Sequence, residues 1–478
     1  MSISLKNDKN YLYIFLTFIF LTLIYLLAEF VITGHQFGVP LDDTWIHYRF
    51  AENFAHGHFF EYNLGEPTPG TTSPLWVIVL SLPFLFSKNL ILIYSLFVGS
   101  LFFLLTCFEV YKLSLKLGFS RNYSLLITML TLLAGRIAWS SLSGMEITLF
   151  CYLTLIIFRI HLNEIEQKRL SIWNGLLLGI SINVRPEAYL FAGIYYITSV
   201  ILLRKEFREN AGRLIVSLFL FIIVVIPYPL FCYIHTGGFL PNTFEGQNAG
   251  LRSIPDSDYI IQTVKYFVKD NVLIFLVWSA GGFYSIYLMI KRRLDSKLFL
   301  MSLWIYLLPA VSAFVSPNWR HHGRYLIPII PFINITAIYI LLKIIDFYEE
   351  KRIRYFALYH KAVISGVILF SFIGTVIFAN ALGWNVENIN DQQVKIAHWL
   401  NTNLPDEKVF GMNDIGAITY ITKRKVVDME GLVTPEIFKI RREQMKDQEQ
   451  NLMKLLRSKG VNYIIIYPEW YEPLMAMY

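Results

Sequence analysis

Long apolar runs alternate with short polar stretches along most of the chain. Runs of about 18 or more apolar residues are long enough to cross the hydrocarbon core of a bilayer as helices. We therefore predict about eleven transmembrane helices, of which the run at 171–184 is the shortest. They lie at 11–33, 89–111, 122–139, 146–162, 171–184, 187–203, 213–232, 271–290, 298–315, 325–343 and 362–382.

Composition supports a membrane protein, and the distribution of charge orients it. Hydrophobic residues make up 55% and charged residues 16% of the chain, whereas soluble domains carry about 25% charged residues. Before residue 383, most Lys and Arg residues fall in loops on the same side of the membrane as Lys6 and Lys9. Such loops stay in the cytoplasm, so we predict an integral inner-membrane protein with a cytoplasmic N-terminus. The run 11–33 is too long for a signal-peptide core and is expected to be retained.

This topology places the polar loop 34–73 and the tail 383–478 on the outer side. A further apolar stretch of thirteen residues lies at 74–86. If it crossed the membrane, every later basic loop would move outside, against the positive-inside rule. We therefore predict that 74–86 is an interfacial or re-entrant piece, or an extension of the next helix.

The tail has the composition of a soluble domain. An amphipathic helical pattern around Val394–Leu400 precedes short apolar stretches near 408–411, 425–428 and 463–467, which read as strands with helical pattern between the last two. The predicted fold class is an all-α polytopic membrane protein, residues 1–382, with a small C-terminal α/β extracytoplasmic domain, residues 383–478.

Several functional classes are disfavoured by the sequence. The net charge of +7 lies in short clusters between apolar runs, and no nucleic-acid-reading motif is present, so we expect no nucleic-acid partner. Cys107, Cys151 and Cys232 lie in or beside apolar runs without C-x-x-C spacing. They predict neither a disulfide framework nor a metal site.

The first outer loop contains a short amphipathic helical pattern. Ile46, Phe50 and Phe54 recur every four residues, and Gly57 suits the end of a helix. We predict a helix lying on the membrane surface. Its candidate substrate-binding residues are His47, Arg49 and Glu52.

Two neighbouring carboxylates, Asp42 and Asp43, begin this helix. Capping of the helix N-terminus explains such residues without any catalytic role. A partly desolvated carboxylate at a membrane boundary is also suited to take the proton of an acceptor hydroxyl that attacks a sugar carbon. Both explanations remain open at this point.

Basic side chains gather between the ninth and tenth predicted helices. Arginine forks match phosphate oxygens, although snorkelling to lipid headgroups would use the same residues. Adjacent His321 and His322 suggest zinc, but helical ligand pairs normally lie four apart, so no metal ligand is assigned. The candidate phosphate-binding residues are Arg320, His321, Arg324 and Tyr325.

Three further ionisable residues lie at predicted outer boundaries. Charged groups are energetically costly at membrane depth, so those that are present are candidates for a functional role. Glu146, Arg185 and Glu187 are therefore candidate substrate-binding residues, although an Arg185–Glu187 structural contact is an equal alternative.

These segments resemble the polytopic GT-C glycosyltransferases that use polyprenyl-phosphate sugars, among them protein O-mannosyltransferases, aminoarabinose transferases and arabinofuranosyltransferases. The clearest likeness is Leu41-Asp-Asp-x-x-Ile-x-x-Arg-x-Ala-x-Asn53 with Tyr62-Asn-x-Gly-Glu66 and Gly70-Thr-Thr-Ser-Pro-Leu-Trp76. Weaker similarity covers Ser143-Gly-Met-Glu146, Arg324-Tyr325 and Asp414-Ile-Gly-Ala-x-x-Tyr420 with Val427-Asp-x-x-Gly-Leu432.

The resemblance implies an inverting transfer in which an acidic residue of the first outer loop is the general base. Asp43 is favoured over Asp42, because Asp42 is better placed to cap the helix. Arg320, His321 and Arg324 would then stabilise the leaving lipid phosphate. The implied partners are a polyprenyl-phosphate-linked sugar donor, membrane lipid, and a glycan, lipid or protein acceptor. Some relatives use a divalent cation and others do not, so a cation is possible and no cofactor is certain.

Three other functions remain open. A lipid-linked-sugar flippase or other transporter should show internal repeats or broken helices, and the sequence pattern predicts neither. A glycan ligase or polymerase should place its main polar site in a large late loop. A receptor would use the tail as a binding module and would not depend on Asp43.

Overall fold

The computed structural model describes residues 8–246, 252–290, 296–350, 356–441 and 445–476. The chain forms two compact units, each assembled from separate segments. The first unit comprises Met1–His35, Leu96–Val224 and Gly250–Gly383, and the second comprises Gln36–Ser95, Val225–Ala249 and Trp384–Tyr478. The predicted boundary between residues 382 and 383 remains a prediction.

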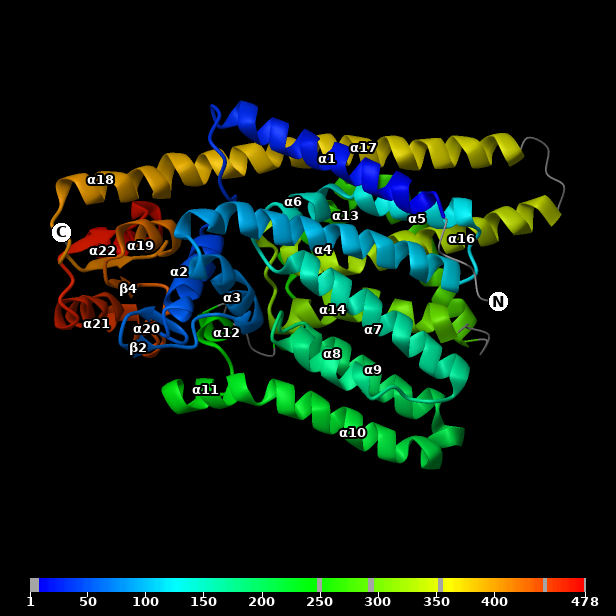
Figure 1. The fold of residues 1–478 in the computed structure, drawn as a ribbon, viewed down its shortest axis with the longest axis horizontal. Coiled ribbons are helices and arrows are strands. Elements are labelled where there is room, and N and C mark those ends of the chain that lie inside the picture. The colour runs from blue at the N-terminus through cyan, green and yellow to red at the C-terminus, as the bar shows by residue number, and fades with distance from the viewer. Residues whose placement is uncertain (1–7, 247–251, 291–295, 351–355, 442–444, 477–478) are drawn as a thin grey trace. The chain divides into compact units, whose positions relative to one another are not determined.

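The first unit is a helical bundle. Helix α1 packs on α5, α13 packs on both α14 and α16, and α7 lies beside α8 and α9 (Figure 1). Its helices are α1 Asn10–Ile32, α4 Ile91–Lys116, α5 Arg121–Leu132, α6 Gly135–Ser141, α7 Ile147–Gln167, α8 Trp173–Ile182, α9 Ala188–Leu202, α10 Phe207–Val225, α13 Ser257–Ile290, α14 Ser296–Val315, α16 Ile330–Glu350 and α17 Phe356–Ile389.

The long apolar helices identify an integral membrane protein. Among the described residues, six helical segments are long and apolar enough to cross a membrane, or eight if two bent pairs each cross once. The predicted number of eleven is not confirmed, because α8 and α9 are apolar but have only 10 and 15 residues. The basic residues at 291–293 and 351–354, which contribute to the predicted orientation, lie outside the described residues.

Several runs expected to be single helices are interrupted, contrary to the sequence prediction. The run 122–139 divides into α5 and α6, which meet at 61°. The run 213–232 divides into α10 and α11 Pro227–Thr236, since proline has no backbone N–H to continue a helix. Helix α13 Ser257–Ile290 begins before the predicted run 271–290 and breaks at Asn271, where that run starts, with φ −169° and ψ 107°. The run from 325 begins as a 3-10 segment, Arg324–Ile329, before α16.

The second unit combines a small sheet with short helices. Strands β4 Val426–Asp428, β3 Phe410–Met412 and β5 Tyr463–Ile465 form a parallel sheet in that order, which confirms the predicted strand positions. The hairpin β1 Glu61–Asn63 and β2 Glu66–Pro67 is separate. The helices are α2 Asp42–Ala55, α3 Pro74–Ser81, α12 Asn242–Gly246, α18 Lys395–Asn403, α19 Gly416–Thr422, α20 Glu436–Arg441, α21 Met445–Ser458 and α22 Glu472–Met475.

Helix α2 is the amphipathic helix predicted for the first loop, but its apolar face is covered by protein. It packs on α3 and α19. Phe50 is fully buried, with its ring centroid 5.1 Å from that of Tyr62. Phe54 lies against Phe59 and Phe60. The stripe therefore stabilises the second unit instead of facing the membrane surface.

Candidate active site

The Asp42 carboxylate caps helix α19 and not its own helix. Leu41 is the extended residue that precedes α2, which corrects the expectation that Asp42 caps α2. One carboxylate oxygen of Asp42 accepts the backbone N–H of Gly416 at 2.7 Å, and the other accepts that of Ala417 at 2.8 Å. Negative charge is favourable at a helix N-terminus, so this contact ties the start of α2 to α19.

A second acidic side chain from the tail lies near this pair. Burial, and after it the charge of Asp414, raise the pKa of the Asp42 carboxyl to about 7, even though the two backbone N–H groups act to lower it. Burial also raises the pKa of Asp414, and Asp43 adds to that rise. Three carboxylates from two distant segments therefore share one electrostatic environment.

Asp414 is held by the residues around it. Gln393 Nε2 donates to its carboxylate at 2.8 Å and to the Tyr467 hydroxyl oxygen at 3.0 Å. Burial and Asp414 raise the pKa of Tyr467 to about 12. Sequence reasoning assigned no role to Gln393 or Tyr467, and it noted Asp414 only as part of a motif.

The remaining α2 candidates are engaged within the second unit. Arg49 donates from Nε to the Tyr62 carbonyl at 3.2 Å, and its Nη1 lies 3.4 Å from Glu52. Glu52 also pairs with Lys423, whose ammonium lies over the Tyr420 ring. These contacts connect α2 with α19. His47 is buried on the same helix, and roles in substrate binding remain predictions for all three candidates.

In the first unit, five predicted residues come together. Arg185 Nη1 lies 2.6 Å from Glu146, and Nη2 lies 2.8 Å from Glu187. The Tyr325 ring centroid is 4.9 Å from the Arg185 guanidinium and 5.2 Å from that of Arg324. Arg324 also donates to the Tyr325 hydroxyl at 3.2 Å. Two guanidiniums, two carboxylates and one phenol thus form a connected polar cluster.

The other two phosphate-binding candidates, Arg320 and His321, lie just before Arg324 in the chain and are more exposed to solvent than it is. Arg320 and His321 are exposed, whereas Arg324 is 7% exposed. Among the described residues, no group of three or more His, Cys, Asp or Glu side chains is arranged to hold a metal ion. The described residues therefore offer no group of this kind for a divalent cation.

Comparison with known proteins bears on the fold. Residues 387–477 match a family described as a domain of unknown function (DUF8728). No curated protein matches the sequence. The apo structure of ArnT from Cupriavidus metallidurans is similar, with a TM-score of 0.60 and 12% identity over 96% of this chain and 94% of that chain.

Two further solved structures show the same likeness. ArnT bound to undecaprenyl phosphate matches with a TM-score of 0.57 and 11% identity, over 88% of each chain. The oligosaccharyltransferase AglB from Archaeoglobus fulgidus, in complex with an inhibitory peptide and a dolichol-phosphate, matches with a TM-score of 0.56 and 13% identity. That match covers 87% of this chain and 64% of AglB. The predicted resemblance to polytopic GT-C glycosyltransferases is thereby confirmed at the level of the fold.

Proposed function

We propose that the protein is an inverting membrane glycosyltransferase that moves a sugar from a polyprenyl-phosphate donor to an extracytoplasmic acceptor. The observation that carries this proposal is that Asp42 has a structural role, which leaves the catalytic role to its neighbour Asp43. Both Asp42 oxygens accept backbone N–H groups of α19, so Asp42 positions the start of α2. Asp43, the next residue in the same first turn, is the general base.

The reaction balances with one proton transfer. The acceptor hydroxyl gives its proton to the Asp43 carboxylate as its oxygen attacks the anomeric carbon. The bond between that carbon and the phosphate oxygen breaks, and the lipid phosphate leaves with the bonding electrons. A pKa of about 7 would also suit Asp42 to act as a base, but a base must reach the acceptor, and the Asp42 oxygens already hold α19.

The leaving phosphate is assigned to Arg324 with Tyr325, supported by the exposed Arg320 and His321. Fixed cations aimed at developing charge are the largest catalytic contribution in such transfers. Arg185 has a different part, because Glu146 and Glu187 already neutralise it. We assign Arg185 as a positioning residue that holds Tyr325 beside Arg324.

The donor class follows from two kinds of support. ArnT was solved with undecaprenyl phosphate and AglB with dolichol-phosphate, and the fold of this chain is similar to both. The sequence of the first loop also resembles that of transferases that use such donors. Glycan, lipid and protein acceptors all remain compatible with the proposal.

A transporter of lipid-linked sugars is the second candidate, and one observation favours it. Transporters use discontinuous helices, and the structure has the interrupted pair α5 and α6 and the break in α13. These interruptions weaken the argument against transport that rested on unbroken helices at the membrane midplane. A transporter would move the lipid-linked sugar without forming a new glycosidic bond.

A deletion strain tests the role of Asp43. Mass spectrometry of its envelope glycans should find a sugar missing from the acceptor, with wild-type protein restoring the sugar and Asp43→Asn failing to restore it. Restoration by Asp43→Asn at wild-type expression would reject the proposed mechanism. Glu61→Gln in the same loop is the control and should restore the sugar.

A further inference from the structure

A turn of left-handed backbone precedes Arg324. His321 has φ 53° and ψ 55°, His322 has φ 58° and ψ 27°, and Gly323 has φ 62° and ψ 42°. Residues with a Cβ rarely adopt this conformation, and successive ones are rarer still. Strained backbone of this kind persists only where its surroundings impose it, and it concentrates at functional sites.

The fully buried side chain of Arg136 holds this turn. Its Nη1 donates to the His322 carbonyl at 3.2 Å and reaches the Gly323 carbonyl at 3.5 Å. A Cβ on Gly323 would lie 2.9 Å from the Tyr266 ring and 3.1 Å from Arg136 Nη1. The turn therefore fits against Arg136 only with its left-handed backbone and a glycine at 323.

Asp270 fixes the other edge of the same guanidinium. Arg136 Nε donates to both carboxylate oxygens, at 2.8 and 2.9 Å, and Nη2 donates at 2.5 Å. The rings of Tyr266 and Phe267 lie 5.3 and 5.1 Å from the guanidinium carbon. A planar arginine held in this way presents its remaining nitrogen in one direction only.

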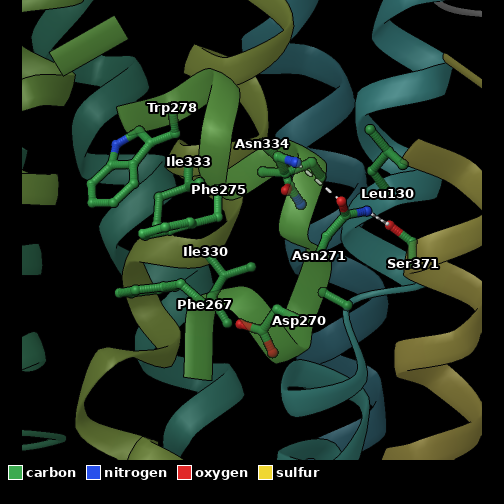
Figure 2. A pocket seen from close by; sticks show the side chains of 12 residues that line it. Leu130, Phe267, Asp270, Asn271, Phe275, Trp278, Ile330, Ile333, Asn334 and Ser371 are labelled. Atoms are coloured by element: carbon green, nitrogen blue, oxygen red, sulfur yellow. Dashed lines mark hydrogen bonds between the residues drawn. The ribbon is translucent and has the colours of Figure 1, made fainter. Parts of the chain in front are cut away.

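The break in α13 positions Asp270. Figure 2 shows Asp270 and Asn271 at the break, with Asn271 bonded to Ser371. Asn271 Oδ1 accepts the N–H groups of Leu273 and Ile274, and Nδ2 donates to Ser371 and to the Val367 carbonyl. The cavity at the break has a volume of about 20 Å³, room for about one water. The break is therefore a support and not a ligand pocket.

We propose that Arg136 and Asp270 are positioning residues that hold the 320–324 turn in the shape that recognises the phosphate of the lipid donor. This inference rests on the proposed function, because that function assigns the phosphate to Arg324. The pair acts through the backbone of the turn and does not touch the phosphate. Neither residue was a candidate from the sequence, since they lie 134 positions apart.

The test measures phosphate recognition separately from binding of the lipid chain. Purified full-length protein in nanodiscs is titrated with undecaprenyl phosphate and with undecaprenol, which lacks the phosphate. The ratio of the two dissociation constants reports recognition of the phosphate. Arg136→Lys and Gly323→Ala should each reduce this preference roughly tenfold, the loss expected for about one charge-assisted hydrogen bond.

Glu164→Gln is the matched control. Glu164 is a buried carboxylate of α7 that bonds His161, Asn174 and Tyr195, away from the turn in sequence and in hydrogen bonding. It should lower the unfolding temperature without changing the phosphate preference. A change in this control equal to that in Arg136→Lys would mean that general destabilisation explains both.

The outcomes separate the two proposals. If the wild type and Arg324→Ala show the same phosphate preference, the donor-phosphate assignment in the proposed function is wrong. If Arg324→Ala loses the preference while Arg136→Lys and Gly323→Ala keep it, only the positioning role is wrong. Gly323→Ala leaves the buried ion pair intact, so it decides the question even if Arg136→Lys does not fold.

Discussion

Gly416 donates its backbone N–H to the carboxylate of Asp42 across 2.7 Å, although the two residues lie 374 positions apart. There is no space for a side chain at this contact. A Cβ on Gly416 would lie 2.1 Å from the Asp42 carbonyl oxygen. The start of α2 and the start of α19 are therefore fitted to one another through backbone and carboxylate.

Gly416→Ala should destabilise the protein and reduce sugar transfer. Overpacking of this kind costs about 1–3 kcal/mol, and the displaced α2 would carry Asp43 away from its working position. Gly212→Ala in α10 is the control, because a Cβ there meets nothing within 4 Å. Unfolding temperatures in detergent and transfer rates measure both effects, and an unchanged Gly416→Ala protein would show that the contact is not tight.

Asn63→Ala should weaken the attachment of the first loop to strand β4. The Asn63 side chain donates to the Val426 carbonyl at 2.9 Å and accepts the Val426 N–H at 3.1 Å. Leaving buried backbone groups without partners costs about 1–3 kcal/mol each. Hydrogen exchange at the Val426 amide should accelerate, whereas Asn403→Ala at an exposed site should leave that rate unchanged. Equal protection in wild type and Asn63→Ala would contradict this account.

The Asp42 carboxyl should make stability fall as pH rises. Its pKa is raised in the folded protein from 3.8 to about 7, so the folded state holds the proton more tightly than the unfolded chain. The free energy of unfolding therefore decreases between about pH 4 and pH 7. Asp42→Asn should flatten this dependence, measured as unfolding temperature at about pH 5 and about pH 7.5.

Part of the slope should remain in Asp42→Asn. Burial raises the pKa of Asp428 to about 6 and that of Asp414 above its usual value, and both contribute with the same sign. A slope in Asp42→Asn as steep as in the wild type would mean that the Asp42 proton does not drive it.

The tail should lie outside the cell membrane. The three cysteines of the chain are buried. A single introduced cysteine that reacts with a membrane-impermeant maleimide therefore reveals the side of the membrane on which it lies. Asn403→Cys, at an exposed position of α18, should be labelled in intact cells. Lys9→Cys should be labelled only after permeabilisation. The reverse pattern would overturn the predicted topology.

Local patterns predicted the elements whose stabilising contacts are also local. The stripe of Ile46, Phe50 and Phe54 gave helix α2, and short apolar stretches gave β3, β4 and β5. The break between α5 and α6 was missed because it depends on tertiary contacts. At Gly135 a Cβ would lie 2.5 Å from Phe378 and 2.6 Å from the Gly374 carbonyl, and Tyr25 donates to the Gly135 carbonyl. The apolar pattern itself continues through that break.

Part of the candidate site could be reached from the sequence for the same reason, and its function remains a proposal. Chemistry at membrane boundaries identified Glu146, Arg185 and Arg324, and the structure brings them together around Tyr325. The pairing of Arg136 with Asp270, and of Asp42 with Gly416, has no local signal. These partners are far apart in sequence, and only the folded backbone makes them neighbours.

The central claim is that Asp43 is the base, and its most direct test is the initial rate of sugar transfer by purified Asp43→Asn protein. The rate should fall by roughly 10²–10⁴-fold, the usual contribution of a general base, at an unchanged unfolding temperature. Asp42→Asn should also lower the rate, because an amide offers one acceptor oxygen to the two backbone N–H groups of α19. Full activity in Asp43→Asn, or loss of activity confined to Asp42→Asn with stability intact, would contradict the account.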